Sequence, residues 1–221
     1  MVGQGSVGGI AVPMMTRRKV VVGAAAAGCV ALGAGGYWAY RTVTAADLMQ
    51  AGPLGDQALG DRNAPVTMIE YASLTCVHCA RFYQEVFPKL DEQYIRTGKV
   101  RFILREFPFD ALAAGAFALA RCVDKDKYFA IVDRLFQSQT TWMVERPVGP
   151  LRAVFADFGL TETAFDACLQ DQRLADGVMW VRDRAAGEFK VSATPTFFIN
   201  RKMYVGGMSF DDLEKIIRPL T

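Results

Sequence analysis

Two cysteines and the only histidine of this chain lie together in one run of four residues, Cys76-Val77-His78-Cys79. Two residues between the cysteines is a spacing at which neighbouring thiols form a reversible disulfide. The chemistry that this pattern predicts is thiol–disulfide exchange, in which a thiolate attacks a disulfide sulfur. We therefore expect Cys76 and Cys79 to form a redox-active disulfide.

The segments on either side of these four residues predict that they lie between a strand and a helix. Residues 66–71 are short, β-branched and apolar, and residues 80–95 form a long amphipathic pattern. Cys76 then falls at the helix N-terminus, where free backbone N–H groups and the helix dipole favour a thiolate. An imidazolium at His78 would favour it further, unless that side chain is merely solvated. We expect Cys76 to be the nucleophile and Cys79, one turn inside the helix, the resolving thiol.

A zinc site is the alternative use of a closely spaced cysteine pair. Structural zinc normally takes four protein ligands. The sequence has no second pair of cysteines at this spacing and no second histidine, and Cys122 and Cys168 stand alone. We therefore expect neither a metal ion nor a cofactor.

The pattern after the cysteine pair predicts a strand followed by a long helical region. Residues 100–106 are apolar and follow a crossover helix, so they should pair in parallel with the first strand. Residues 110–190 contain no convincing strand pattern, and helices are expected over 111–123, 126–138, 149–158 and 163–188. This region reads as a helical insertion.

The chain returns to strand character near its C-terminus. Strands over 196–199 and 202–205, joined by a turn, predict a hairpin. Ser209, with Asp212 three residues later, forms a capping box that opens a last amphipathic helix. The apolar side of this helix should face the sheet.

The N-terminal part of the chain differs in kind from the rest. Thr16-Arg17-Arg18-Lys19 precede an uncharged segment over 20–40, about the length that crosses a bilayer. We expect residues 1–41 to be a signal or a membrane anchor, of secretory or twin-arginine type, that exports the rest of the chain. Residues 42–55 predict a linker, and the folded domain is expected to cover 56–221.

Length and charge limit the remaining possibilities. With 221 residues, 52% of them hydrophobic, the chain can form one compact catalytic domain. The formal net charge is +2, and no basic run interleaved with aromatic residues is present. Nucleic acid is therefore not an expected partner.

The order of these elements resembles the α/β thioredoxin-like fold with an inserted α-helical subdomain that DsbA-like thiol oxidases have. The resemblance extends from about residue 56 to the C-terminus. It depends on two motifs, the run from Glu70 to Cys79 and the run from Val191 to Thr196 (VSATPT), with room between them for the inserted helices. Val77 stands where the best-known members carry proline, and the residues between the cysteines help to set the redox potential.

The resemblance also implies roles for three residues outside the cysteine motif. Pro195 would follow a cis peptide bond and lie against the cysteines, and Thr194 would present its backbone to a client peptide. The carboxylate of Glu70 would lie beneath the active site, with a raised pKa, and take or relay the proton of Cys79. The alternatives are an ordinary trans proline at a strand start and a solvated edge glutamate.

A second disulfide is implied for the helical insertion. Some DsbA-like proteins of alphaproteobacterial type carry one there, and the resemblance pairs Cys122 with Cys168. The alternative is two buried free thiols, because cysteine also behaves as a small apolar residue.

The function that the resemblance implies is a protein thiol:disulfide oxidoreductase in the periplasm. It would introduce disulfides into reduced, unfolded or folding exported proteins through Cys76 and Cys79. A membrane quinone-linked oxidase of the DsbB kind would reoxidise it, and residues 20–40 could anchor it to the inner membrane. A disulfide reductase or isomerase of the same fold is the first alternative, and a non-catalytic chaperone is the second.

Overall fold

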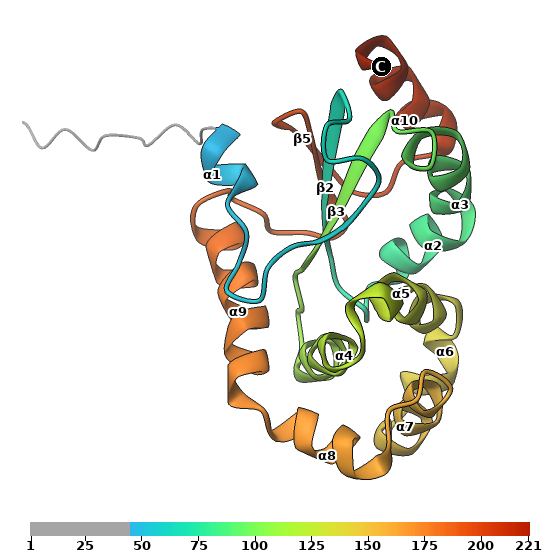
Figure 1. Cartoon of the computed structure of the whole chain (residues 1–221), viewed down its shortest axis with the longest axis vertical. Coiled ribbons are helices and arrows are strands. Elements are labelled where there is room, and N and C mark those ends of the chain that lie inside the picture. The colour runs from blue at the N-terminus through green and yellow to red at the C-terminus, as the bar shows by residue number, and fades with distance from the viewer. Residues whose placement is uncertain (1–44) are drawn as a thin grey trace, which may run out of the picture. The chain divides into compact units, whose positions relative to one another are not determined.

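A five-stranded mixed sheet is central to the computed structural model, which describes residues 45–221 (Figure 1). The strands are β1 (Gln57–Leu59), β2 (Val66–Ala72), β3 (Val100–Glu106), β4 (Thr196–Ile199) and β5 (Lys202–Val205). Their order is β1-β3-β2-β4-β5, and β2 and β3 form the parallel pair. The α/β thioredoxin-like fold is therefore confirmed, with the predicted parallel crossover and C-terminal hairpin.

The crossover between β2 and β3 begins at the cysteine motif. It consists of α2 (Val77–Glu85), α3 (Phe87–Leu90) and the π-helical η1 (Asp91–Ile95). Pro88 lies in the first turn of α3, where its missing N–H leaves no helical hydrogen bond unmade. The helix expected from residue 80 thus starts three residues earlier, and it is interrupted at Val86, two residues before Pro88.

The helical insertion follows β3 and contains no strand within the described residues. Its elements are α4 (Ala111–Cys122), the 3₁₀ turn η2 (Lys125–Lys127), α5 (Tyr128–Gln137), α6 (Gln139–Trp142), α7 (Val148–Ala156), α8 (Glu162–Gln170) and α9 (Gln172–Gly187). The single helix predicted over 163–188 is wrong. Asp171 adopts an extended conformation there and its carboxylate accepts from the N–H groups of Arg173 and Leu174, so it caps the start of α9.

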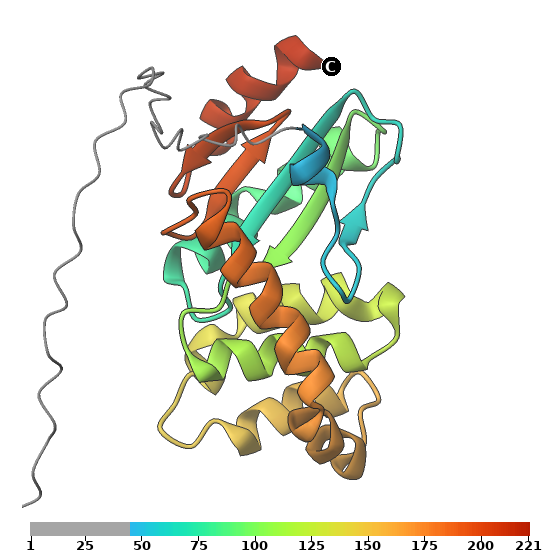
Figure 2. The same ribbon diagram turned by 90° about the vertical axis from the view of Figure 1, so that its left-hand side faces the viewer.

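Alternate residues of the three central strands β2, β3 and β4 serve two different cores. On one side of the sheet, α2, α3 and the C-terminal α10 (Phe210–Ile217, followed by the 3₁₀ turn η3, Arg218–Leu220) cover residues such as Met68, Phe102 and Phe197. On the other side, α1 (Ala45–Met49) and α9 cover Ile69 and Phe198 (Figure 2). This period of two decides which strand residues face the active-site helix.

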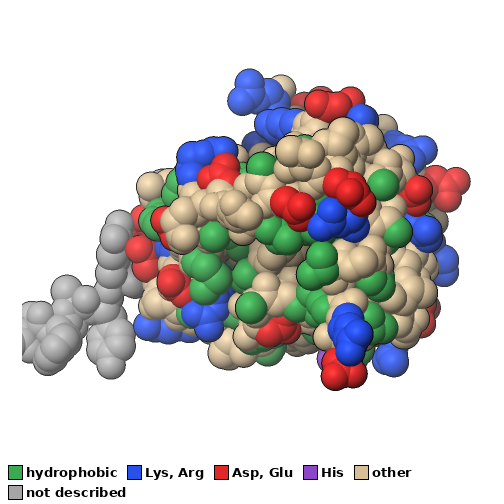
Figure 3. Space-filling model, turned by 90° about the horizontal axis from the view of Figure 1, so that it is seen from below, with side chains coloured by type: hydrophobic (Ala, Val, Ile, Leu, Met, Phe, Trp, Pro, Cys, Tyr) green, Lys and Arg blue, Asp and Glu red, His purple; other side chains and the backbone are tan. Residues whose placement is uncertain are grey.

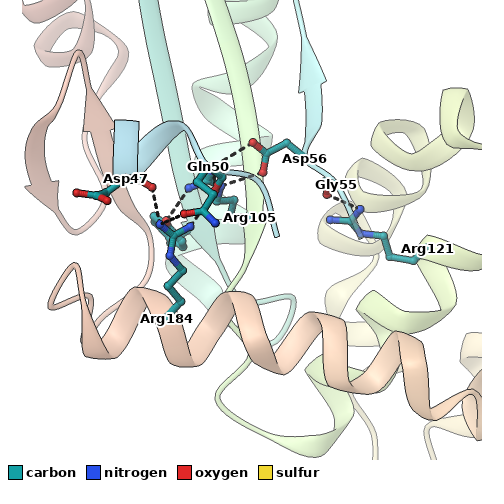
Figure 4. A network of polar contacts seen from close by, with 8 residues as sticks. Asp47, Gln50, Gly55, Asp56, Arg105, Arg121 and Arg184 are labelled. Atoms are coloured by element: carbon teal, nitrogen blue, oxygen red, sulfur yellow. Dashed lines mark hydrogen bonds and ion pairs between the residues drawn. The ribbon is translucent and has the colours of Figure 1, made fainter. Parts of the chain in front are cut away.

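Residues 45–55, the described part of the linker predicted over 42–55, are packed against the fold. Leu48 in α1 is only 3% exposed, and burying a leucine side chain contributes about 2 kcal/mol. Arginines from three other elements donate hydrogen bonds to backbone carbonyls between residues 47 and 55 (Figure 4). Arg184 donates to the carbonyl oxygens of Asp47 and Gln50, at 2.7 and 2.9 Å, and Arg121 donates to that of Gly55 at 2.9 Å. Composition suggested a loop, but these contacts make the segment part of the folded unit.

Arg105 is the most deeply buried of these three arginines. Its guanidinium forms a bidentate ion pair with Asp56, at 2.9 Å for each bond, and also donates to the hydroxyl of Tyr71 at 3.0 Å. A fourth bond reaches the carbonyl of Gln50 at 3.2 Å. Because a buried guanidinium needs such partners, β3 and the N-terminal segment stabilise each other.

The surface on the side of the insertion carries charges of both signs. Figure 3, seen from that side, shows acidic and basic side chains interspersed with apolar ones. This face therefore offers no continuous basic surface to a polyanion.

The predicted signal or anchor over 1–41, including the apolar segment 20–40, lies outside the described residues. Among residues 45–221, no helix is both long and apolar enough to cross a membrane.

Candidate active site

Cys76 occupies the N-cap position of α2. Its backbone is extended, with φ −84° and ψ 118°, and its Sγ accepts a hydrogen bond from the N–H of Cys79 at 3.4 Å. An N-cap side chain is aimed at the unpaired N–H groups and at the positive end of the helix dipole. The predicted location at the helix N-terminus is thus confirmed.

The surroundings of Cys76 lower the pKa of its thiol from 9.0 to about 5. The largest cause is a hydrogen bond from the side chain of Cys79, and the side chain of Thr194 and the backbone N–H groups of Cys79 and His78 act in the same direction. Partial burial opposes them. At neutral pH the sulfur is therefore a thiolate, the species that attacks and leaves in disulfide exchange.

Cys79 is the buried partner of the pair. Both cysteines are free thiols in the structure, and the side chain of Cys79 is fully buried in the core beneath α2. Burial raises the pKa of Cys79 well above its usual value, and its hydrogen bond to Cys76 and the charge of Glu70 raise it further. The two sulfurs are thus unequal, with Cys76 ionised and Cys79 holding its proton.

His78 has an exposed side chain. The structure shows its backbone N–H lowering the pKa of Cys76, whereas the imidazole is not among the causes. The side chain lines a groove of about 480 Å³ between α2 and the loop after β5. Stabilisation of the thiolate by the imidazole therefore stays a prediction.

The loop that contains Pro195 lies against the cysteine pair, although 118 residues separate the two motifs. The Thr194–Pro195 peptide bond is cis, as the resemblance implied. The Sγ of Cys76 lies 3.3 Å from the carbonyl oxygen of Thr194, to which the thiol donates when it is protonated. The hydroxyl oxygen of Thr194 is buried and has no hydrogen-bond partner among the described residues.

Glu70 is buried on the same side of the sheet as the active-site helix. Glu70 is two residues after Met68 on β2, so the two side chains point to the same side of the sheet. Met68 lies in the core beneath α2, and Glu70 is 0% exposed. Neither carboxylate oxygen has a hydrogen-bond partner in the described part of the chain. Burial therefore raises its pKa well above 4.5, and the charge of Cys76 adds to this shift. The solvated edge position considered for Glu70 is wrong.

Tyr83 is a neighbour of this site that the sequence reasoning missed. It lies four residues after Cys79 on the same buried side of α2, and its hydroxyl has no partner among the described residues. Burial and the charge of Glu70 raise its pKa well above 10.0. The i, i+4 spacing from Cys79 was a signal that could have found it.

Three polar residues around the turn before Cys76 were also missed. The side-chain amide of Gln139 donates to two carbonyl oxygens of this turn, and the hydroxyl of Thr75 donates to Asp110 at 2.7 Å. Asp110 also caps α4 through the N–H of Ala113. An N-cap pattern could have identified Asp110, but no local pattern marks Gln139.

The second disulfide is present in the helical insertion. Cys122 at the end of α4 is bonded to Cys168 in α8, with 6.2 Å between their Cα atoms. The implied pairing is thus confirmed, and the alternative of two free thiols is wrong. Among the described residues no group of three or more potential metal ligands occurs.

The fold and this site together define the class of protein. A parallel β2–α2–β3 unit, a cysteine pair at the start of α2 and a cis proline beside it are combined with an inserted helical region. The family model described as Thioredoxin matches residues 54–218. The chain therefore belongs to the thioredoxin family, and within it to the DsbA-like proteins.

Comparison with solved structures and curated relatives supports this assignment. The crystal structure of Wolbachia pipientis alpha-DsbA1 is 33% identical, with a TM-score of 0.74 over 80% of this chain and 96% of that one. A "Putative protein-disulfide oxidoreductase" of Rickettsia bellii is 29% identical over 66% of this chain and 57% of its own length. A "Probable disulfide bond formation protein D" of Bacillus anthracis is 29% identical over 73% of this chain and 76% of its own.

The lengths of these relatives differ. The chain spans little more than half the length of the Rickettsia proteins that it matches, 57% and 59% in two of them.

Proposed function

We propose that this chain is a protein thiol:disulfide oxidoreductase that passes the Cys76–Cys79 disulfide to reduced exported proteins. The observation that supports this most directly is the contrast between the two thiols. The pKa of Cys76 is about 5, whereas that of Cys79 is raised well above its usual value by burial. A reduced form with a stable thiolate makes the disulfide a strong oxidant.

In the first step a client thiolate attacks the Sγ of Cys76 in the disulfide form. A client–Cys76 disulfide forms, the bond between the two active-site sulfurs breaks, and Cys79 departs with the electron pair. Because its pKa is raised, Cys79 takes up a proton, and the carboxyl of Glu70, whose pKa burial also raises, would supply it.

In the second step another client thiolate attacks the client sulfur of the mixed disulfide. Cys76 leaves as a thiolate, and its low pKa makes it a good leaving group. The client gains a disulfide, and the Cys76–Cys79 pair gains two electrons. The chemistry needs neither a metal ion nor a bound cofactor.

The magnitude of the thiolate effect can be stated from the two pKa values. A pKa of about 5 in place of 9.0 stabilises the reduced form roughly 100-fold at pH 7, which corresponds to about 60 mV. Cys76 is only half-buried, so solvent screening makes this an upper limit. Because the lowered pKa stabilises the reduced form of this protein, it favours oxidation of clients over their reduction.

The clients would bind across the groove beside His78 and against the Thr194 carbonyl. Apolar Phe82, Val86 and Met208 line the groove together with charged Arg81 and Glu85, a mixture that suits an unfolded segment with both apolar and polar side chains. Val77, which follows Cys76 in the chain and is 61% exposed, adds apolar surface beside the nucleophile. The reduced protein would then be reoxidised by a membrane quinone-linked partner of the DsbB kind.

Action in the periplasm is part of this proposal. It is supported by the basic residues before the apolar segment 20–40, which predict export, and by the second disulfide, which persists only in an oxidising compartment. Retention of residues 20–40 would hold the domain at the inner membrane.

The test is to trap the mixed disulfide and to measure the redox equilibrium. A Cys79→Ala variant should accumulate a client disulfide through Cys76 that mass spectrometry identifies, and the wild-type pair should oxidise a reduced peptide in glutathione buffer. No trapped adduct would contradict the mechanism. A redox equilibrium far on the side of the disulfide form, with insulin reduction, would instead favour the reductase.

A further inference from the structure

The turn that precedes the nucleophile is held by a side chain from the helical insertion. The Nε2 of Gln139, the first residue of α6, donates to the carbonyl oxygen of Leu74 at 2.8 Å and to that of Cys76 at 3.2 Å. Gln139 is only 7% exposed and Leu74 is fully buried. A buried carbonyl oxygen needs a hydrogen-bond donor. Here the donor to Leu74 comes from Gln139, which is 65 residues away in the chain.

Three hydrogen bonds fix the corner between α5 and α6 from which Gln139 reaches the turn. The indole of Trp142, which is fully buried, donates to the carbonyl of Leu135 at 2.7 Å, and the hydroxyl of Ser138 donates to that of Arg134 at 2.7 Å. Gln84 in α2 donates to the carbonyl of Phe136 at 3.1 Å, so this corner is also fixed to the active-site helix.

The insertion also contacts the turn through a second residue. The hydroxyl of Thr75 donates to one oxygen of the Asp110 carboxylate at 2.7 Å, and the other oxygen accepts from the N–H of Ala113 at 2.7 Å. Asp110 therefore joins the start of α4 to the residue before the nucleophile. The turn is held by side chains from two different helices of the insertion.

We propose that Gln139 is a positioning residue that keeps the turn of residues 74–76 in the conformation in which Cys76 is ionised. This inference rests on the proposed role of Cys76 as nucleophile. The N–H groups of Cys79 and His78 aim at the Cys76 sulfur only while the N-cap backbone is extended. The two bonds from Gln139 fix the carbonyls on either side of that backbone.

The partial charges of the Gln139 amide also favour the thiolate of Cys76. The carbonyl oxygens of Leu74 and Cys76 carry partial negative charge close to the thiolate, and the carbonyl of Cys76 also accepts the helical bond from Ala80 at 3.1 Å. The Gln139 N–H groups place partial positive charge against both oxygens. Loss of this donor leaves a more negative surrounding, which raises the pKa of the sulfur.

The direct test replaces Gln139 by methionine, which has nearly the same length but no donor. Gln139→Met should raise the pKa of Cys76 by about one unit and shift the glutathione equilibrium roughly 10-fold toward the disulfide form at pH 7, about 30 mV. Gln137→Met is the matched control, because Gln137 is exposed and bonds only to Asp133. The control should leave both values unchanged.

A second variant keeps the test decisive if Gln139→Met does not fold. Gln139→Asn retains the amide but is one methylene shorter, so it cannot reach both carbonyls, and it should raise the pKa of Cys76 in the same direction. A folded variant of either kind with the pKa and redox equilibrium of the wild type would overturn the role of Gln139. A wild-type pKa near 9 would instead contradict the proposed function itself, so the two failures are distinguishable.

Discussion

The thiol of Cys76 lies 3.3 Å from the carbonyl oxygen of Thr194, so the start of the active-site helix and the cis-proline loop meet at the reactive sulfur. The side chain of Thr194 also lowers the pKa of Cys76. The same residue therefore acts on the nucleophile and presents backbone to a client peptide. Changes at Thr194 should alter thiol ionisation as well as client binding.

Thr194→Val removes the hydroxyl that favours the thiolate and keeps the shape of the side chain. We expect the pKa of Cys76 to rise, and the oxidising power at pH 7 to fall, because the thiolate loses one of its stabilising contacts. Thiolate absorbance followed across a pH titration measures this shift. Thr140→Val, at an exposed position of α6, should show the wild-type curve, and an unchanged or lower pKa in Thr194→Val would contradict the assigned contact.

Glu70→Gln should change how stability depends on pH. The folded-state pKa of Glu70 is raised above the unfolded value near 4.5, so its contribution is fully present below that pH and is lost as pH rises toward the folded-state pKa. Wild type should therefore lose stability relative to Glu70→Gln above pH 4.5, by up to about 1.4 kcal/mol per pH unit. Denaturant unfolding of the reduced proteins at pH 4 and pH 7 measures the difference. An identical difference at the two pH values would show that Glu70 does not titrate in this way.

Removal of the second disulfide should mainly lower stability. Cys122 and Cys168 close a loop with a sequence separation of 46, for which the chain-entropy model gives about 4 kcal/mol. The double variant Cys122→Ala with Cys168→Ala should lose stability of this order in denaturant unfolding, with the active-site pair held reduced in both proteins. A loss below about 1 kcal/mol would mean that the unfolded chain is already constrained in this region.

Arg105→Met tests whether the segment before β1 belongs to the fold. The change leaves Asp56 without its buried partner and removes bonds to Tyr71 and Gln50, so a loss of about 3–5 kcal/mol is expected. Limited proteolysis should then cut within 45–57. Arg101→Met on the same strand is the control, and a variant as stable and protease-resistant as the control would contradict the account.

Much of the site could be predicted from the sequence because its signals are local. The cysteine spacing, the strand before it and the helix after it place Cys76 at an N-cap, whereas the place of Glu70 beneath the active site was implied only by the family resemblance. The hairpin of β4 and β5 also has its predicted bounds.

The features that were missed depend on contacts between distant parts of the chain. Gln139 reaches a turn 65 residues away, and Arg105 pairs with Asp56 across 49 residues. The glycine and proline content of residues 42–55 indicated a loop, but it could not show that arginines bind the backbone of this segment. Asp171 carried an N-cap signal that was masked by the apolar periodicity continuing on both sides of it.

The most direct test of the whole account is the pKa of the Cys76 thiol in the reduced protein. The rate of Cys76 alkylation, measured across pH with Cys79→Ala in parallel to separate the two sulfurs, reports this value. The account predicts a pKa of about 5 in the wild-type protein and a higher one when the Cys79 side chain no longer donates to Cys76. A wild-type thiol that titrates near 9.0, as an unperturbed cysteine does, would contradict it.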